Sequence, residues 1–177
     1  ADGSVRALLV RGNGQIVLGG EFSQVNQQPL TGVALLNPDG TLNPGFQADL
    51  SGTTLDPIWT IDLGLPHVHA LAEHQGRILM GGRFVMVNGQ PRGRIARLLD
   101  DGSPDPSFNP NPGPDPAVED GGSLPDVTAI NALAVQPDGK ILLGGCFETW
   151  SSAVAARAVA RLNADGSIDT SFSVTDE

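Results

Sequence analysis

Cysteine, lysine and long apolar runs are all scarce in this chain of 177 residues. The one cysteine, Cys146, excludes an internal disulfide and every multi-cysteine zinc motif. Lys140 is the one lysine, and 20 acidic residues outweigh 10 basic ones. The net charge of −10 makes nucleic acid a poor partner, because the phosphate backbone requires a basic surface. No apolar stretch approaches the roughly 20 residues of a membrane span, and the N-terminal residues lack a signal-peptide pattern.

Glycine and proline, in contrast, are abundant, with 23 and 14 residues. This content is high for a globular protein but lies below the roughly 25–30% that is typical of low-complexity disorder. Hydrophobic residues make up 40% of the chain and charged residues 17%, which is enough apolar material for a core. We therefore expect an ordered, turn-rich fold.

Two sequence motifs each occur three times, at spacings close to 62 residues. The first places a Gly-Gly pair before a phenylalanine, and the second places an Asp-Gly pair before a phenylalanine. The first reads IVLGGEF at 16–22, ILMGGRF at 78–84 and ILLGGCF at 141–147; the second reads NPDGTLNPGF at 37–46, LDDGSPDPSF at 99–108 and NADGSIDTSF at 163–172. All six phenylalanines of the chain lie in these motifs, so the aromatic core is modular.

Each repeat predicts four short strands. In the third repeat they are INALAV (130–135), KILLGGCF (140–147), AVARLN (158–163) and SIDTSF (167–172). The Asp-Gly pairs supply the positive φ that hairpin turns require, and no segment has helical periodicity. Four antiparallel strands per repeat fit one β-propeller blade, whereas a β-helix rung is much shorter. We predict an all-β fold, a β-propeller built from three four-stranded blade repeats.

The predicted blades span residues 1–50, 67–112 and 129–177, and the two inserts between them span 51–66 and 113–128. The second insert is proline-rich and acidic. The paired glycines of each blade are expected where backbones crowd together towards the ring axis.

A first strand, then QPDGKILLGG (136–145), a variable loop and ARLNADGSIDTSF (160–172) together resemble the delta-60 repeat of bacterial β-propeller proteins. Residues 129–172 resemble this repeat best, and residues 4–46 depart from it most. The resemblance implies a propeller found in large secreted or surface proteins, with an extracellular, periplasmic or cell-surface location. It implies no catalytic residues.

Three blades leave both ends of the arc uncovered, because propellers typically close with 4–8 blades. Three arrangements remain open. The chain begins close to its first strand and ends soon after its last, as a segment of a longer array would. Alternatively, two chains form a homodimer that closes a six-bladed ring, since symmetric dimers are the commonest assemblies. In the third arrangement the open arc packs on other protein subunits.

The inserts and the loops are the least repetitive regions, and binding residues commonly lie on loops. Trp59 lies in the first insert, and Trp150 follows the third Gly-Gly motif. An exposed tryptophan favours a protein interface, or a glycan site in which the ring stacks on a sugar. For Trp59, packing with Ile61 over a blade edge is an equal alternative.

Arg6, His69 and Asn131 occupy the same position in the first strand of the three repeats. We predict that they face the central channel and form a candidate pocket. His67 lies two residues before His69 and shares its strand face, but two imidazoles do not complete a zinc site. A polar channel position is favoured over a metal site.

The Asp-Gly turns also invite a calcium interpretation. In the third repeat, however, the two end positions of a calcium loop fall on Arg161 and Phe172, which cannot bind the ion. Turn capping by Asp39, Asp101 and Asp165 is the simpler explanation.

Arginine and aspartate recur eight residues apart in the second and third repeats. The pairs are Arg97 with Asp105 and Arg161 with Asp169, and the first repeat has Leu35 at the arginine position. This spacing predicts an ion pair across the hairpin of the third and fourth strands.

No catalytic arrangement emerges from the motifs. Cys146 has no histidine base beside it, and there is no Ser-His-Asp pattern or phosphate-binding loop. We expect no cofactor and no metal. The prediction is a non-enzymatic scaffold or accessory subunit of an extracytoplasmic complex. A glycan-binding propeller and an enzyme with a channel-centred site are the alternatives.

Overall fold

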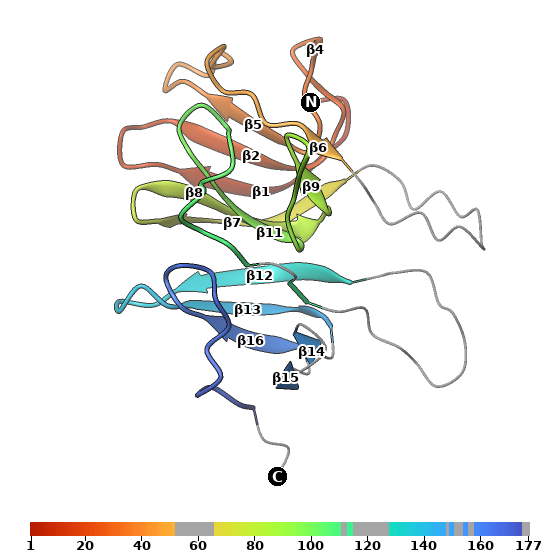
Figure 1. Cartoon of the computed structure of the whole chain (residues 1–177). Coiled ribbons are helices and arrows are strands. Elements are labelled where there is room, and N and C mark those ends of the chain that lie inside the picture. The colour runs from red at the N-terminus through yellow and green to blue at the C-terminus, as the bar shows by residue number, and fades with distance from the viewer. Residues whose placement is uncertain are drawn as a thin grey trace, which may run out of the picture.

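The structure is a computed structural model of the chain that describes residues 1–51, 66–110, 113–114, 128–147, 149–150, 154–155 and 158–174. These residues form strands and turns, which confirms the predicted all-β fold (Figure 1). No helix able to cross a membrane occurs among them. Most of both predicted inserts, Trp59 and Ile61 lie outside the described residues.

Three antiparallel sheets of three strands each form the blades. In each sheet the strand with the Gly-Gly pair lies in the middle. Blade 1 contains β1 (Ser4–Val10), β2 (Ile16–Glu21) and β5 (Val33–Leu36); blade 2 contains β7 (His67–His74), β8 (Arg77–Arg83) and β11 (Ile95–Leu98); blade 3 contains β12 (Ala129–Val135), β13 (Ile141–Cys146) and β16 (Val159–Leu162).

The predicted fourth strand is much shorter than the sequence suggests. In each blade it is reduced to one β-bridge, formed by Leu42, Pro104 or Ile168. In blade 3 the carboxylate of Asp169 accepts a hydrogen bond from the Ser171 amide, and the Phe172 amide donates to the Asp169 carbonyl. These bonds form a turn, so the chain leaves the sheet directly after the bridge.

A small hairpin, taken from sequence as a variable loop, joins the second and third main strands of each blade. The hairpins are β3 (Gln24–Val25) with β4 (Gln28–Pro29), β9 (Met86–Val87) with β10 (Gln90–Pro91), and β14 (Thr149–Trp150) with β15 (Val154–Ala155). The chain that leaves blade 1 adds β6 (Leu50–Ser51) to β9, and Pro114 bridges to Trp150 in the same way. Each blade is therefore tied to the hairpin of the next.

Blade 2 lies between its two neighbours, and the first strands of the blades are adjacent: β1 contacts β7, and β7 contacts β12 (Figure 1). Along β8 the side chains alternate between the two interfaces. Ile78 and Met80 pack in the core with blade 1, whereas Leu79 packs in the core with blade 3. A strand that is buried on both faces needs a continuous apolar run, which the ILM of this motif supplies.

Candidate functional site: a polar row on the innermost strands

Each first strand contains a β-bulge at the same position. The register shifts between Val5 and Ala7 in β1, and at the equivalent positions in β7 and β12. The extra residues are the three that the sequence placed at the channel: Arg6, His69 and Asn131. A bulge bends the strand and redirects a side chain, and bulges are common beside functional sites.

The bulges explain the second glycine of each Gly-Gly pair. There the backbone of the first strand approaches so closely that a Cβ atom would overlap a carbonyl oxygen. The overlapping pairs would be Gly20 with the Ser4 carbonyl, Gly82 with the His67 carbonyl, and Gly145 with the Ala129 carbonyl. The expectation of crowded backbones at these glycines is confirmed.

Glu21 joins blade 1 to blade 2 beside the first bulge. Its carboxylate accepts a hydrogen bond from Arg6 Nε at 3.1 Å, and its other oxygen lies 3.0 Å from His67 Nε2. The His67 and His69 rings are tilted, with centroids 5.8 Å apart. The polar contacts that begin on β1 therefore continue across the blade boundary to β7.

His69 continues the contact from blade 2 to blade 3. Its Nδ1 donates to the side-chain oxygen Oδ1 of Asn131 at 2.7 Å, and Asn131 Nδ2 lies 3.6 Å from Cys146 Sγ. The connected set is called the inner polar row, and its members are Arg6, Glu21, His67, His69, Asn131 and Cys146.

Electrostatics fix the charge states in part of this row. The hydrogen bond from Arg6 lowers the pKa of Glu21, and nearby histidine adds to the effect. Burial lowers the pKa of His67 below its ordinary value, although Glu21 opposes that shift. At neutral pH an ionised Glu21 therefore accepts a hydrogen bond from a neutral His67 ring.

The thiol of the inner polar row has no base among its hydrogen-bond neighbours in the part of the chain that the structure describes. Cys146 is exposed, and its hydrogen-bond neighbour in the row is the amide of Asn131 rather than a base. Within the described ranges, no group of three or more His, Cys, Asp or Glu side chains could hold a metal ion.

The sequence missed Glu21 and His67 as members of the row, because both act across a blade boundary. Ser4 and Glu21 are direct partners in the register of blade 1, and His67 with Arg83 is the equivalent pair in blade 2. Superposing the repeats would have shown that the residue after each Gly-Gly pair lies beside the first strand.

Trp150 does not form an exposed surface. Its side chain is 1% accessible and lies in the core of blades 2 and 3, edge-to-face with Phe147 at 6.3 Å. It occupies the hairpin position of Val25 and Val87, which are also buried. The ring therefore offers no face to a sugar, and the exposure that an interface role required is absent.

The aspartates of the Asp-Gly turns cap their own turns, as predicted. Each accepts a hydrogen bond from the backbone amide two residues later, at 3.0 Å for Asp39, 2.9 Å for Asp101 and 3.0 Å for Asp165. The same carboxylate oxygens also accept hydroxyl bonds from Thr41, Ser103 and Ser167, respectively.

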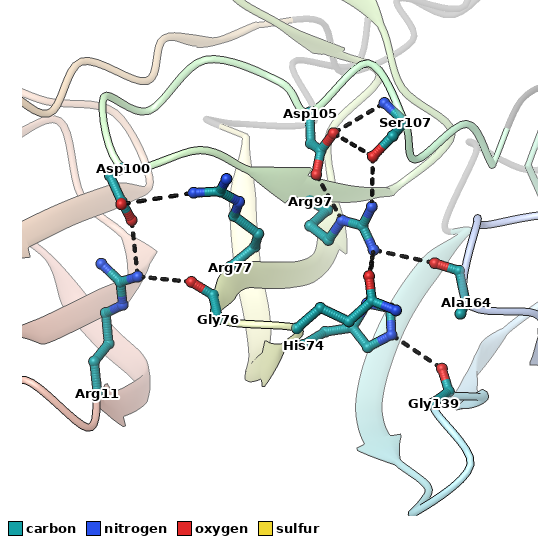
Figure 2. Close-up of polar contacts among 11 residues, drawn as sticks. Arg11, His74, Gly76, Arg77, Arg97, Asp100, Asp105, Ser107, Gly139 and Ala164 are labelled. Carbon is teal, nitrogen blue, oxygen red and sulfur yellow. Dashed lines mark hydrogen bonds and ion pairs between the residues drawn. The ribbon is translucent and has the colours of Figure 1, made fainter.

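Both predicted arginine–aspartate pairs form, at 2.9 Å for Arg97 with Asp105 and 2.8 Å for Arg161 with Asp169. Arg97 also bonds to the carbonyl of Ala164 in blade 3 and donates to His74 Nδ1 (Figure 2). Because Nδ1 accepts, the opposite nitrogen of His74 donates, and it lies 3.0 Å from the Gly139 carbonyl. Burial lowers the pKa of His74, so the neutral ring joins blade 2 to blade 3.

Comparison with known proteins agrees with this architecture. A family model described as a domain of unknown function (DUF5122) beta-propeller matches residues 11–46, 76–108 and 136–172. Each match runs from the turn before the Gly-Gly strand to the phenylalanine after the Asp-Gly turn, and together they cover more than half of the chain. No curated protein matches the chain. Three matched repeats, each on one three-stranded blade, show that the chain belongs to the DUF5122 β-propeller family.

Proposed function

We propose that this chain is a non-enzymatic propeller segment that binds other proteins through the two end faces of its blade arc. It acts as a scaffold or as an accessory structural subunit. The observation that carries the proposal is the exposed apolar row on β1, where Val5, Leu8 and Val10 are 42%, 65% and 68% accessible. Exposed apolar patches of this kind mark interaction surfaces.

The residues equivalent to Val5 and Leu8 in the other two blades are covered. Val68 and Ile130, at the position of Val5, are fully buried, and Leu71 and Leu133, at the position of Leu8, pack against the cores. The face of blade 1 therefore has the composition of a blade interface without a neighbour. Blade 3 has an opposite face on which Val159 is 36% accessible.

Other properties of the protein belong to the same proposal. The bacterial origin, the delta-60 designation and the extracytoplasmic location are supported by the motif resemblance and by the acidic, lysine-poor composition. The non-enzymatic role is supported by the inner polar row, in which the thiol has an amide rather than a base as its neighbour.

The test is capture of the tagged protein from its native host, with a carboxylate-directed cross-linker that suits 20 acidic residues and one lysine. We expect partner proteins whose cross-links lie around blade 1 and blade 3, and we expect Leu8→Asp to abolish those from blade 1. Gln90→Glu, on the exposed hairpin of blade 2, is the control for added charge. Cross-links that map elsewhere and survive Leu8→Asp would overturn the proposal.

A ligand-binding propeller is the second candidate, because the inner polar row presents Arg6 and Asn131 as exposed side chains. Trp59 remains its candidate stacking residue. Tryptophan fluorescence during titration with neutral and acidic oligosaccharides tests it. A saturable change that Trp59→Phe or Arg6→Gln abolishes would favour this candidate, and no change would remove it.

A further inference from the structure

The first glycine of each Gly-Gly pair forms a socket for the next blade. A Cβ at Gly19 would lie 2.7 Å from Val68 Cγ1 and 3.1 Å from Leu71 Cδ1. At Gly81 the corresponding distances are 2.6 Å to Ile130 Cγ2 and 3.4 Å to Leu133 Cδ1. Both interfaces inside the chain are thus formed by a branched side chain and a leucine seated on a glycine.

Blade 3 has the glycine, and blade 1 has the apolar side chains, of a third contact of this kind, but the two do not meet within the chain. Gly144 has only its own blade nearby, with Ala132 Cβ at 3.6 Å from a built Cβ and the Ala158 carbonyl at 3.9 Å. On blade 1, Val5 and Leu8 occupy the positions of Val68 and Leu71 and are exposed. Blade 3 therefore has an empty socket, and blade 1 has the side chains that fit it.

A second contact repeats in the same way at the Asp-Gly turns. The Gln47 amide donates to the Asp101 carbonyl of blade 2 at 2.8 Å, and the Asn109 amide donates to the Asp165 carbonyl of blade 3 at 2.9 Å. Gly102 and Gly166 are crowded by these segments, whereas a Cβ on Gly40 of blade 1 would meet nothing within 4 Å. Ser173, which follows Phe172 as Gln47 follows Phe46, is the matching donor position.

A third contact joins the turns between the first two strands. Arg11 donates to the Gly76 carbonyl at 2.9 Å, and His74 donates to the Gly139 carbonyl (Figure 2). Gln136 holds this position in blade 3, and its buried amide oxygen has no hydrogen-bond partner in the described part of the chain. Gly14 is the matching glycine on blade 1. A blade seated beside blade 3 would bring the Gly14 carbonyl within reach of the donor Gln136 Nε2, as the glycine carbonyls accept from Arg11 and His74 in the internal interfaces.

We infer that blade 3 of one copy binds blade 1 of a second copy in the register of the internal interfaces, so that two copies close a six-bladed ring. In this contact Val5 and Leu8 sit on Gly144, Gln136 meets the Gly14 turn, and Ser173 meets the turn at Gly40. This inference rests on the proposed function, since it names the partner of the two end faces.

The contact is head-to-tail, so each end face binds only the opposite one. Two identical contacts close the ring, and six blades lie within the usual range for propellers. Closure also sets the inner polar rows of both copies around one axis, because those rows lie on the innermost strands of the blades.

The experiment measures the solution mass of the 177-residue protein by light scattering and sedimentation over a dilution series. We expect a particle of twice 18.3 kDa. Leu8→Asp disrupts the apolar face of blade 1. Gly144→Val fills the socket of blade 3, and the added Cβ has ordinary van der Waals room within that blade. Each variant alone should lose the two-copy particle while its circular dichroism stays native-like and its unfolding midpoint equals that of the wild-type protein diluted to single copies.

The decisive step is to mix the two variants. Each retains the face that the other lacks, so an equimolar mixture should recover one of the two contacts. The mixed pair should therefore associate, more weakly than the wild type, into a particle that contains both variants. A wild-type protein that is monomeric throughout the dilution series would overturn the inference, and so would two variants that do not associate with each other at any concentration of the series. The capture experiment reports separately on the proposed function, because another protein on the blade 1 face would still be lost with Leu8→Asp.

Discussion

Blades 2 and 3 differ more in their surroundings than in their sequences. Both contain the arginine–aspartate pair, but the Arg97 side chain is 4% accessible and binds groups of two blades, whereas Arg161 is 21% accessible. Lys140 also reaches Asp169 in blade 3, at 2.8 Å. The same motif is thus buried between blades in one case and partly exposed in the other, because among the described blades of a single chain only blade 2 has a neighbour on both sides.

The largest expected effect comes from replacing the arginine of each pair, Arg97 in blade 2 and Arg161 in blade 3. Arg97→Met leaves Asp105 buried without its partner and removes the bonds to His74 and Ala164, so the unfolding free energy should fall by about 3 to 5 kcal/mol. Arg161→Met should cost about 1 kcal/mol, because Lys140 still pairs with Asp169. Chemical denaturation of both variants measures the contrast, and equal losses would show that the neighbouring blade adds nothing.

The first glycines of the Gly-Gly pairs allow the same comparison of blades 2 and 3 for apolar contacts. Gly81→Val drives a side chain into Ile130 and should destabilise the protein by about 1 to 3 kcal/mol. Gly144→Val meets no neighbouring blade within the chain and should change the monomer by less than about 0.5 kcal/mol. Unfolding is followed at a concentration where the mass is that of one copy. A large loss from Gly144→Val would contradict the assignment of an open socket.

His74 makes the contact between blades 2 and 3 sensitive to pH. Its pKa is lowered in the folded state from 6.5, so the unfolded chain binds the proton more tightly. The contribution is therefore complete above pH 6.5 and is lost as the pH falls below that value. Denaturation on either side of pH 6.5 should show lower stability in acid.

The control for this pH effect is His74→Gln, which carries the residue that blade 3 has at Gln136. This variant should reduce the dependence of the unfolding free energy on pH without reversing its sign. Burial also lowers the pKa of His67, so His67→Gln should remove a further part of the same slope. An unchanged slope in both variants would assign the pH response to other groups.

The smallest effect concerns the residue before the third main strand of each blade. Gly32, Arg94 and Ala158 all have positive φ there, at 74°, 62° and 66°. Ala158→Gly should relieve left-handed strain and raise the unfolding free energy by about 0.5 to 1 kcal/mol, whereas Gly32→Ala should lower it. Thermal unfolding compares the two, and a loss of stability in Ala158→Gly would show that backbone entropy outweighs the strain.

Much of the architecture could be predicted from the spacing of short motifs. Gly-Gly before phenylalanine marks the middle strand of every blade, and the arginine–aspartate spacing identified two real ion pairs. These features depend on residues that are close in the chain or paired within one blade. The short fourth strand and the central hairpins were missed, because Asx turns and two-residue strands leave little periodicity.

The candidate site was predictable by position but not by partner. Arg6, His69 and Asn131 follow from superposing the repeats, yet the contacts of Glu21 with His67 and of His69 with Asn131 cross blade boundaries. Trp150 illustrates the opposite case. Its loop location suggested exposure, but the hairpin places it in the valine position of the other blades and buries it.

Local chemistry thus accounts for the strands, the turns and the repeat itself, because hydrogen-bonded pairing and Asx capping act between residues near in sequence. The packing of one blade on the next determines which of the equivalent residues are buried, which form polar contacts with another blade, and which are exposed. Leu71 and Leu8 have the same motif position. Leu71 lies on a glycine of the neighbouring blade and packs against the core, whereas Leu8 has no such neighbour among the described residues and is exposed. Burial depends on contacts between distant segments, and those exist only once the blades are arranged in space.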